Sequence, residues 1–318
     1  MTIPTGHLLA LVTGIALTAS AGAGTHNGFD LTGALVPVEE ILAGGPPRDG
    51  IPAIDRPRFE RADAARLDDG DRVLGLRRNG VAKAYPVAIL NWHEIVNDRL
   101  GDEPVVITFC PLCGSGVAFS ARALGTVHHF GVSGLLYNSD VLLYDRETGS
   151  LWSQLLGQAV TGPLRGTPLQ MLPLTHTTWG HWRHDHPDSL VLSRDTGYAR
   201  DYDRDPYAGY VDSAGVFFPV RHRDPRFHPK ARVLGLVLDG RAKAWPFSEL
   251  SRARGKTIED RLGGRRLRIR FDAGSETAVI EDEAGRPLPG TVLFWFAWYA
   301  FHPDTAVYRH PGPQEETQ

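Results

Sequence analysis

The only two cysteines of the 318-residue chain, Cys110 and Cys113, form the motif Cys-Pro-Leu-Cys-Gly between two apolar runs. In such a turn both thiolates can bind one metal ion, because backbone N–H groups point at the sulfurs and the glycine adopts a conformation that a side chain would hinder. A closed zinc site needs four ligands and the chain has no further cysteine, so histidine must complete the set. His93 lies in a Trp-His-Glu triplet shortly before the strand that carries the cysteines. The sequence therefore predicts a site for zinc or copper at Cys110, Cys113 and His93, since thiolate and imidazole suit these metals.

Two other interpretations of the cysteine pair stay open. A strand that leads into Cys-x-x-Cys is typical of thiol–disulfide oxidoreductases, with Cys110 as the nucleophile and Cys113 as the resolving thiol. In those enzymes a long helix activates the first thiol, whereas Gly, Ser and Val after Cys113 are poor residues for the start of a helix. The third interpretation is a structural disulfide in a non-enzymatic binding module, and closing so short a loop would stabilise the fold little.

Acidic and polar side chains near the cysteines are candidates for supporting roles. If the metal is catalytic, Glu94 or Asp140 would relay protons beside an open coordination position that binds substrate or oxidant. The segment GVSGLLYNSDVLLYDRETGSLWSQ also carries enough polar groups to line a pocket for a small molecule; these are Ser133, Tyr137, Asn138, Asp140, Asp145 and Arg146. Turn chemistry with a solvated strand face explains the same residues equally well.

His128 and His129 are weaker candidates for metal ligands. Adjacent residues of a strand face opposite sides, so at most one of the two would bind. The chain also contains no GxSxG, no GxGxxG after a strand, no P-loop and no HExxH. The common hydrolase, dinucleotide, nucleotide and zinc-protease signatures are therefore absent from the sequence.

Three blocks of sequence occur twice in the same order, and they indicate which elements must position these residues. The pairs are RVLGLRRNGVAKAYP at 72–86 with RVLGLVLDGRAKAWP at 232–246, NDRLGDEPVVITF ending at Phe109 with EDRLGGRRLRIRF ending at Phe271, and WGHWRHDHPD from Trp179 with WFAWYAFHPD from Trp295. Each copy predicts a hairpin closed by Asn-Gly or Asp-Gly, a short helix after proline and then a β-branched strand. We expect a β-rich α+β protein with short helices, made of two related halves from an internal duplication.

The second copy lacks the residues predicted for chemistry. Cys110 aligns with Asp272, the Cys-Pro-Leu-Cys segment has no equivalent, and ARGKTIED replaces the block NWHEIVND that contains His93. Residues common to both copies, including the triplet His186-Pro187-Asp188, are therefore expected to serve the fold. Residues present only in the first copy are the better candidates for function.

The beginning of the chain predicts export. The apolar run LLALVTGIALTASAGA at 8–23 ends in small residues, as a secretory signal does, and it falls short of the roughly 20 apolar residues that span a bilayer. We expect a periplasmic or extracellular protein, with an uncleaved amino-terminal anchor as the alternative. The predicted divisions are a signal peptide or anchor at 1–23, a leader segment at 24–54, the first half at 55–195, a connecting segment at 196–224, the second half at 225–310 and a tail at 311–318.

The charge of the chain excludes one class of partner. With 34 basic and 37 acidic residues the formal net charge is −3, which gives no electrostatic footprint for nucleic acid. No later segment of the sequence is long and apolar enough to cross a membrane. The expected partner is a metal ion or a small molecule, and no strong membrane partner is expected beyond the possible amino-terminal anchor.

The blocks YPVAILNWHEIVND, TFCPLCGSGVAF, FGVSGLLYNSDVLLYDRETGSLWSQ and FHPDTAVY resemble the bacterial domain-of-unknown-function family 3179, over about residues 55–310. The resemblance marks His93, Cys110 and Cys113 as parts of family blocks and implies no particular activity. The residues themselves therefore carry the functional prediction, which is an exported protein that binds copper or zinc for redox or metal-handling chemistry.

Overall fold

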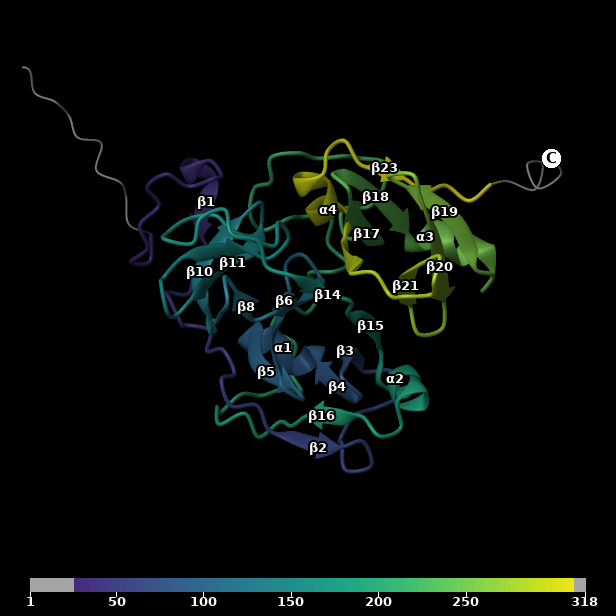
Figure 1. The fold of residues 1–318 in the computed structure, drawn as a ribbon, viewed down its shortest axis with the longest axis horizontal. Coiled ribbons are helices and arrows are strands. Elements are labelled where there is room, and N and C mark those ends of the chain that lie inside the picture. The colour runs from purple at the N-terminus through teal and green to yellow at the C-terminus, as the bar shows by residue number, and fades with distance from the viewer. Residues whose placement is uncertain (1–25, 312–318) are drawn as a thin grey trace, which may run out of the picture.

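The computed structural model describes residues 26–311, so the predicted signal peptide or anchor at 1–23 and nearly all of the predicted tail at 311–318 lie outside the described residues. Strands make up 40% of the structure and short helices 11%. Five sheets of three to five strands are arranged as a five-bladed β-propeller (Figure 1). The prediction of a β-rich protein with short helices is confirmed, whereas the sequence did not predict the propeller.

The five sheets combine strands that lie far apart in the sequence. The first sheet has the order β1 (Ile41–Ala43), β10 (Phe130–Tyr137), β11 (Asp140–Asp145), β12 (Leu151–Ser153) and β13 (Gln158–Ala159). The second has the order β14 (Met171–Leu172), β7 (Ser115–Ser120), β6 (Glu103–Cys110) and β5 (Ile95–Leu100). The third has the order β15 (Thr175–Thr178), β3 (Arg72–Arg78), β4 (Val81–Pro86), β16 (Leu190–Leu192) and β2 (Phe59–Arg61). The fourth has the order β22 (Thr291–Phe294), β17 (Arg232–Leu238), β18 (Arg241–Pro246) and β23 (Ala306–Val307), and the fifth the order β19 (Ile258–Leu262), β20 (Arg265–Asp272) and β21 (Thr277–Asp282).

Short helices and one small ribbon complete the described part of the chain. The α-helices are α1 (Val87–His93), α2 (Trp179–Asp185), α3 (Phe247–Leu250) and α4 (Trp295–Phe301). The 3-10 helices are η1 (Val38–Glu40) and η2 (Ser251–Ala253), and the two-stranded ribbon pairs β8 (Arg122–Ala123) with β9 (Thr126–Val127). Among residues 26–311 no helix has the length and apolar character needed to cross a membrane.

The predicted hairpins and helix starts are found where the turn residues indicated. Asn79 and Asp239 have φ values of 50° and 51°, and each is followed by a glycine that also has positive φ, which is the backbone of a tight hairpin turn. Pro86 and Pro246 cap the amino termini of α1 and α3. Proline suits these positions because its fixed φ and missing N–H cost nothing where a helix begins.

The third and fourth sheets share their strand order and register. Val73 of β3 lies opposite Pro86, as Val233 of β17 lies opposite Pro246. In both sheets the last of the matching strands runs parallel to the hairpin, β16 along β4 and β23 along β18. The repeated hairpin block and the repeated Trp/His-Pro-Asp block therefore occupy matching positions at these two sheets. The remaining repeated block forms β5 and β6 of the second sheet and β19 and β20 of the fifth.

A tryptophan packs on a glycine in each of these two sheets. A Cβ atom at Gly75 would lie 2.3 Å from the ring of Trp182, and one at Gly235 would lie 2.3 Å from the ring of Trp298. Only glycine permits so close an approach. Both indole N–H groups donate 2.8 Å hydrogen bonds, from Trp182 to the Ser189 hydroxyl and from Trp298 to the Thr305 hydroxyl. The shared tryptophans therefore fix α2 and α4 on their sheets.

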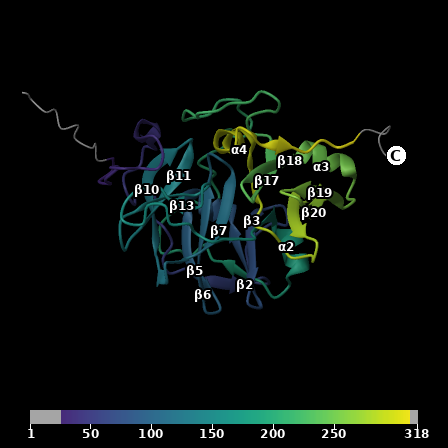
Figure 2. The ribbon, with the colours of Figure 1, turned by 45° about the horizontal axis from the view of Figure 1, so that its top comes forward.

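The largest region of the core joins several blades and contains both cysteines. Buried side chains of the first, second and fourth sheets meet there, among them Phe119, Trp152 and Phe294. Residues 193–231, which include the connecting segment at 196–224, form no helix or strand and pack against this core through Tyr207, Tyr210 and Phe218. Figure 2 shows how this long loop passes beside α4.

Candidate metal centre

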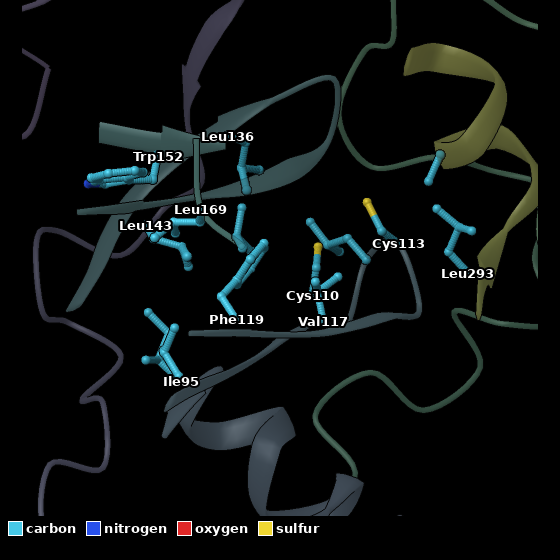
Figure 3. Close-up of a cluster of buried hydrophobic side chains, with 14 of the residues drawn as sticks. Ile95, Cys110, Cys113, Val117, Phe119, Leu136, Leu143, Trp152, Leu169 and Leu293 are labelled. Atoms are coloured by element: carbon cyan, nitrogen blue, oxygen red, sulfur yellow. The ribbon is translucent and has the colours of Figure 1, made fainter. Parts of the chain in front are cut away.

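The two cysteines flank a tight turn between adjacent strands of the second sheet. Cys110 is the last residue of β6 and lies opposite Ser115, the first residue of β7. The carbonyl of Cys113 accepts a 2.8 Å hydrogen bond from the N–H of Phe294, which fixes the turn against the fourth sheet. Both side chains are free thiols with no exposed surface, and they lie among buried apolar side chains (Figure 3).

A second turn, from the first sheet, faces the cysteines. Residues Asn138 and Ser139 join β10 to β11 with φ values of 51° and 67°. The carbonyl of Ser139 accepts hydrogen bonds from both thiols, at 3.3 Å from the Cys113 sulfur and 3.7 Å from the Cys110 sulfur. The next residue, Asp140, contributes a carboxylate oxygen, and this oxygen and the two sulfurs all lie within 4.8 Å of one another. The β10–β11 hairpin therefore brings a carboxyl group to the thiols.

The carboxyl group of Asp140 is buried, and only one of its two oxygens accepts a hydrogen bond. Its Oδ2 accepts a 3.1 Å hydrogen bond from the N–H of Leu155, whereas its Oδ1 has no hydrogen-bond partner. Burial raises the pKa of Asp140 to about 8. Burial also raises the pKa values of the Cys110 and Cys113 thiols. All three groups therefore hold their protons at neutral pH, because the charged forms are poorly solvated in the core.

Glu94 is a further buried acid beside this group. It follows α1 in the left-handed conformation, with φ of 58°, and its carbonyl accepts a 2.7 Å hydrogen bond from the N–H of Phe109. Burial raises the pKa of Glu94 to about 8, and its charge contributes to the raised pKa of Cys110. Neither Glu94 nor Asp140 forms an ion pair with a basic residue among the described part of the chain. The site is thus rich in acidic groups and has no balancing cation from the protein.

The prediction that His93 completes the ligand set needs correction. Its Nδ1 lies 2.7 Å from the Pro52 carbonyl and its Nε2 lies 2.7 Å from the Tyr202 hydroxyl, so both ring nitrogens are already bonded. The register of β5 and β6 extends as far as the hydrogen bond between Glu94 and Phe109, which would place His93 opposite Cys110. The left-handed backbone at Glu94 ends this strand, and His93 becomes the last residue of α1 instead.

The residues predicted to line a pocket make separate structural contacts. The Ser133 hydroxyl donates to the Leu142 carbonyl, and Asn138 accepts a 2.8 Å hydrogen bond from the N–H of Arg221. Arg146 lies 3.3 Å from a carboxylate oxygen of Asp55. Tyr137 packs its ring against Phe301, and Asp145 accepts a 2.8 Å hydrogen bond from the indole of Trp152. A surface cavity of about 640 Å³ lies elsewhere, between α1 and the connecting segment, and is lined by none of the predicted site residues.

The connecting segment packs against the core region that contains the cysteines. Tyr210 is buried in the same core region, and its hydroxyl has no hydrogen-bond partner. Burial is the main cause that raises the pKa of Tyr210, and the nearby Cys113 and Cys110 thiol groups raise it further. The Lys230 ammonium donates to the carbonyls of Tyr210, Ser213 and Gly215, at 3.2, 2.7 and 2.6 Å. These three hydrogen bonds hold the segment in place beside this core region.

Sequence reasoning singled out Asp140 for another role, as a proton relay. The Asn-Ser-Asp turn between two apolar strands is a readable hairpin signal, and it occurs only in the first half of the chain. This hairpin was not among the predictions, although the signal would have indicated it. The signal does not indicate which other turn the hairpin would face, because the contact joins two different sheets.

Fold and site together define a five-bladed β-propeller that buries two free thiols and a carboxyl group at one point in its core. Residues 48–288 match the family described as "Protein of unknown function (DUF3179)". The chain belongs to this family, which confirms the resemblance found in the sequence. Neither a curated protein nor a solved structure matches the chain.

Proposed function

We propose that Cys110, Cys113 and Asp140 bind a transition metal ion, zinc or copper, for metal-handling or redox chemistry. One observation carries the proposal: the fully buried Asp140 carboxyl group, one oxygen of which has no hydrogen-bond partner, places an oxygen within 4.8 Å of two fully buried sulfurs. A buried polar atom without a hydrogen-bond partner lowers the stability of a protein unless something binds it. Thiolate and carboxylate are both metal ligands, so a cation would satisfy all three groups at once.

The electrostatics of the site supports a cation in particular. Two thiols and two carboxyl groups, those of Asp140 and Glu94, share a dry region in which burial raises all four pKa values. A bound metal ion replaces protons on its ligands, so metal affinity increases with pH. In this site the ion would supply the positive charge that the protein does not.

The donor set distinguishes the two candidate metals. Zinc takes thiolate and carboxylate ligands together and would use all three donors, whereas Cu(I) favours the two sulfurs and has less use for the carboxylate. A metal bound by three protein donors keeps one open coordination position, at which a Lewis-acidic ion can activate a ligand. Glu94 would hold a proton near that position.

The other interpretations of the cysteine pair have less support. A redox-active thiol needs a lowered pKa and an accessible sulfur, whereas burial here raises both thiol pKa values and no sulfur is exposed. The residues after Cys113 form strand β7 and not a helix. The two cysteines are free thiols, which gives a structural disulfide no support.

Metal content tests the proposal directly. The full chain, purified without chelator, is dialysed against Zn²⁺ or Cu(I) and analysed by mass spectrometry, together with the Cys110→Ser/Cys113→Ser and Asp140→Asn variants. We expect the wild-type protein to hold one ion more than the double variant; Asp140→Asn weakens zinc binding but leaves Cu(I) nearly unchanged. Asp102→Asn, in an exposed turn, is the matched control. Equal metal content in wild-type protein and the double variant would overturn the proposal.

Two further proposals concern the origin and the location of the protein. The common strand order, register and Gly–Trp packing of the third and fourth sheets support an internal duplication. The apolar run at 8–23 supports export to the periplasm or the cell exterior. Mass determination of the protein recovered from its native compartment would give the mature amino terminus.

A further inference from the structure

We propose a second metal site, formed by His128, Asp145 and Glu147, that takes a divalent ion such as zinc. It lies at the other end of the β10–β11 hairpin from Asp140 and contains no sulfur. One imidazole nitrogen and one oxygen of each carboxylate lie within 4.8 Å of one another. The site is independent of the cysteine centre, and nothing in the proposed function requires it.

The distances in this cluster fit metal ligands better than hydrogen-bond partners. Nδ1 of His128 lies 3.6 Å from Oδ1 of Asp145 and 3.6 Å from Oε2 of Glu147. These distances are longer than a hydrogen bond. Two ligands of one tetrahedral zinc ion, each bonded at about 2.0–2.1 Å, lie roughly 3.3 Å apart. A small contraction would therefore place all three groups around one ion.

An unpartnered nitrogen supplies the second observation. His128 is 3% exposed, and its Nδ1 has no hydrogen-bond partner although it faces two acceptor groups. A buried ring nitrogen without a partner is uncommon, because desolvation is not repaid. A metal ion between Nδ1 and the carboxylates would satisfy it.

The two carboxylates are already held in place by other residues. Asp145 accepts hydrogen bonds from the Trp152 indole at 2.8 Å and from the Thr148 hydroxyl at 2.9 Å. Glu147 accepts from the backbone N–H of His129 at 3.0 Å, and its other oxygen lies 2.8 Å from Nδ1 of the His129 ring. Outer contacts of this kind orient metal ligands and raise affinity.

The donor types indicate the class of ion. Imidazole with two carboxylates suits zinc and neighbouring divalent transition ions, whereas Ca²⁺ and Mg²⁺ prefer oxygen alone. The Glu147 side chain is 33% exposed, so an ion can reach this site from solvent. The cysteine centre, by contrast, is closed.

The chain offers a matched control for the His–carboxylate distance. Nε2 of His181 lies 3.6 Å from a carboxylate oxygen of Asp185, as far apart as His128 and Asp145, but the two form only a pair on the surface of α2. If the third ligand makes the site, His181 should contribute nothing to binding.

Zinc titration of the full-length protein tests this proposal. The Cys110→Ser/Cys113→Ser variant removes the thiols, and calorimetry with Zn²⁺ alone then reports the second site. We expect one bound ion in this variant, with affinity lowered at least tenfold by Glu147→Gln and unchanged by His181→Gln. Glu147 is partly exposed, so its substitution leaves a folded protein even if His128→Asn does not.

A spectroscopic readout separates this site from the proposed function. Co²⁺ bound at His128 would give visible bands without the thiolate charge-transfer absorption that Cys110 and Cys113 would produce. Absence of zinc binding in the double cysteine variant, or binding that Glu147→Gln leaves unchanged, would overturn the proposal. Neither result would affect the metal content expected for the cysteine centre.

Discussion

The turn after β6 and the turn after β20 occupy the same place in the second and fifth sheets but are stabilised differently. Cys110 lies opposite Ser115 across the first turn, and Asp272 lies opposite Thr277 across the second, in the same register. Asp272 accepts hydrogen bonds from the hydroxyl and the backbone N–H of Ser275, at 2.6 and 2.7 Å, which lowers the pKa of Asp272. The turn after β20 therefore satisfies its own polar groups.

The turn after β6 does not satisfy its own polar groups. Cys113 takes the position of Ser275, and both thiols donate to the Ser139 carbonyl in another sheet. Because an ordinary Asp–Ser turn closes the same strand pair elsewhere in this chain, the turn does not need cysteine. The cysteines therefore contribute something other than closing the strands.

The largest expected effect tests what the third and fourth sheets, the other related pair, have in common. Trp182→Ala and Trp298→Ala each remove a buried indole that packs on glycine, so each should lower the free energy of unfolding by about 3–5 kcal/mol. Chemical denaturation of the two variants measures it. A cost below about 1 kcal/mol for either tryptophan would break the correspondence between the third and fourth sheets.

The next effect tests how the two turns differ. Asp140→Asn should weaken zinc binding by about 100-fold, because it removes a charged ligand from the proposed centre. Asp272→Asn should leave zinc binding unchanged and lower stability by about 1 kcal/mol, since it weakens the bonds to Ser275. Zinc titration and denaturation of both variants separate the roles. Equal zinc affinities would show that the two aspartates do not differ as proposed.

A third effect concerns a buried histidine that the third sheet contains and the fourth sheet replaces with valine. His176 of β15 lies opposite Leu74, where the fourth sheet has Val292 opposite Leu234. Burial lowers the pKa of His176 to about 3, so the unfolded chain binds a proton below its ordinary pKa of about 6.5 while the folded chain does not. The free energy of unfolding should therefore fall with decreasing pH, by about 2 kcal/mol from this residue between pH 6.5 and pH 5.

Denaturation of His176→Val at both pH values checks this expectation. The variant imitates the other sheet and should lose that part of the pH dependence. Burial lowers the pKa of His302 to about 4. His302 should keep its own contribution to the pH dependence of stability in the variant, and it therefore serves as the internal reference. An unchanged difference between the two pH values would contradict the assignment to His176.

The smallest effect tests the two matching hairpins. Asn79→Ala and Asp239→Ala place alanine at φ values near 50°, which should cost about 1–2 kcal/mol each. Glycine at either position should be more stable than alanine because it accepts positive φ freely, although it too loses the contacts of Asn79 with Glu103 and of Asp239 with Arg265. Thermal denaturation of the four variants gives the comparison, and an alanine variant as stable as its glycine partner would remove the backbone explanation.

Local structure was largely predictable from the sequence, because its causes lie within a few residues. The Asn79-Gly80 turn, the helix after Pro86 and the strand VVITF all carry short-range signals. The propeller was not predictable in this way, because β15 pairs with β3 about a hundred residues earlier and β1 pairs with β10. No local pattern specifies such partners.

The candidate site was predictable only in part. Cys110 and Cys113 follow from their spacing, whereas Asp140 was predicted as a proton relay and a pocket residue and not as a ligand. His93 was misplaced as a ligand because one left-handed residue, Glu94, ends the strand before it. The cluster around His128 depends on the β10–β11 register, in which Phe130 lies opposite Asp145. A hairpin prediction that specified this register would have brought His128 and Asp145 together.

The connecting segment would set the time scale of metal exchange at the proposed cysteine centre. Tyr210 packs in the same core region as the thiols, and the Lys230 ammonium binds three carbonyls of the loop, so we expect access to the sulfurs to require detachment of this segment. A metal ion held there would exchange at the rate at which the loop opens, not at the rate at which its coordination bonds break. Residence time at the cysteine centre would then be governed by a lysine that binds no metal.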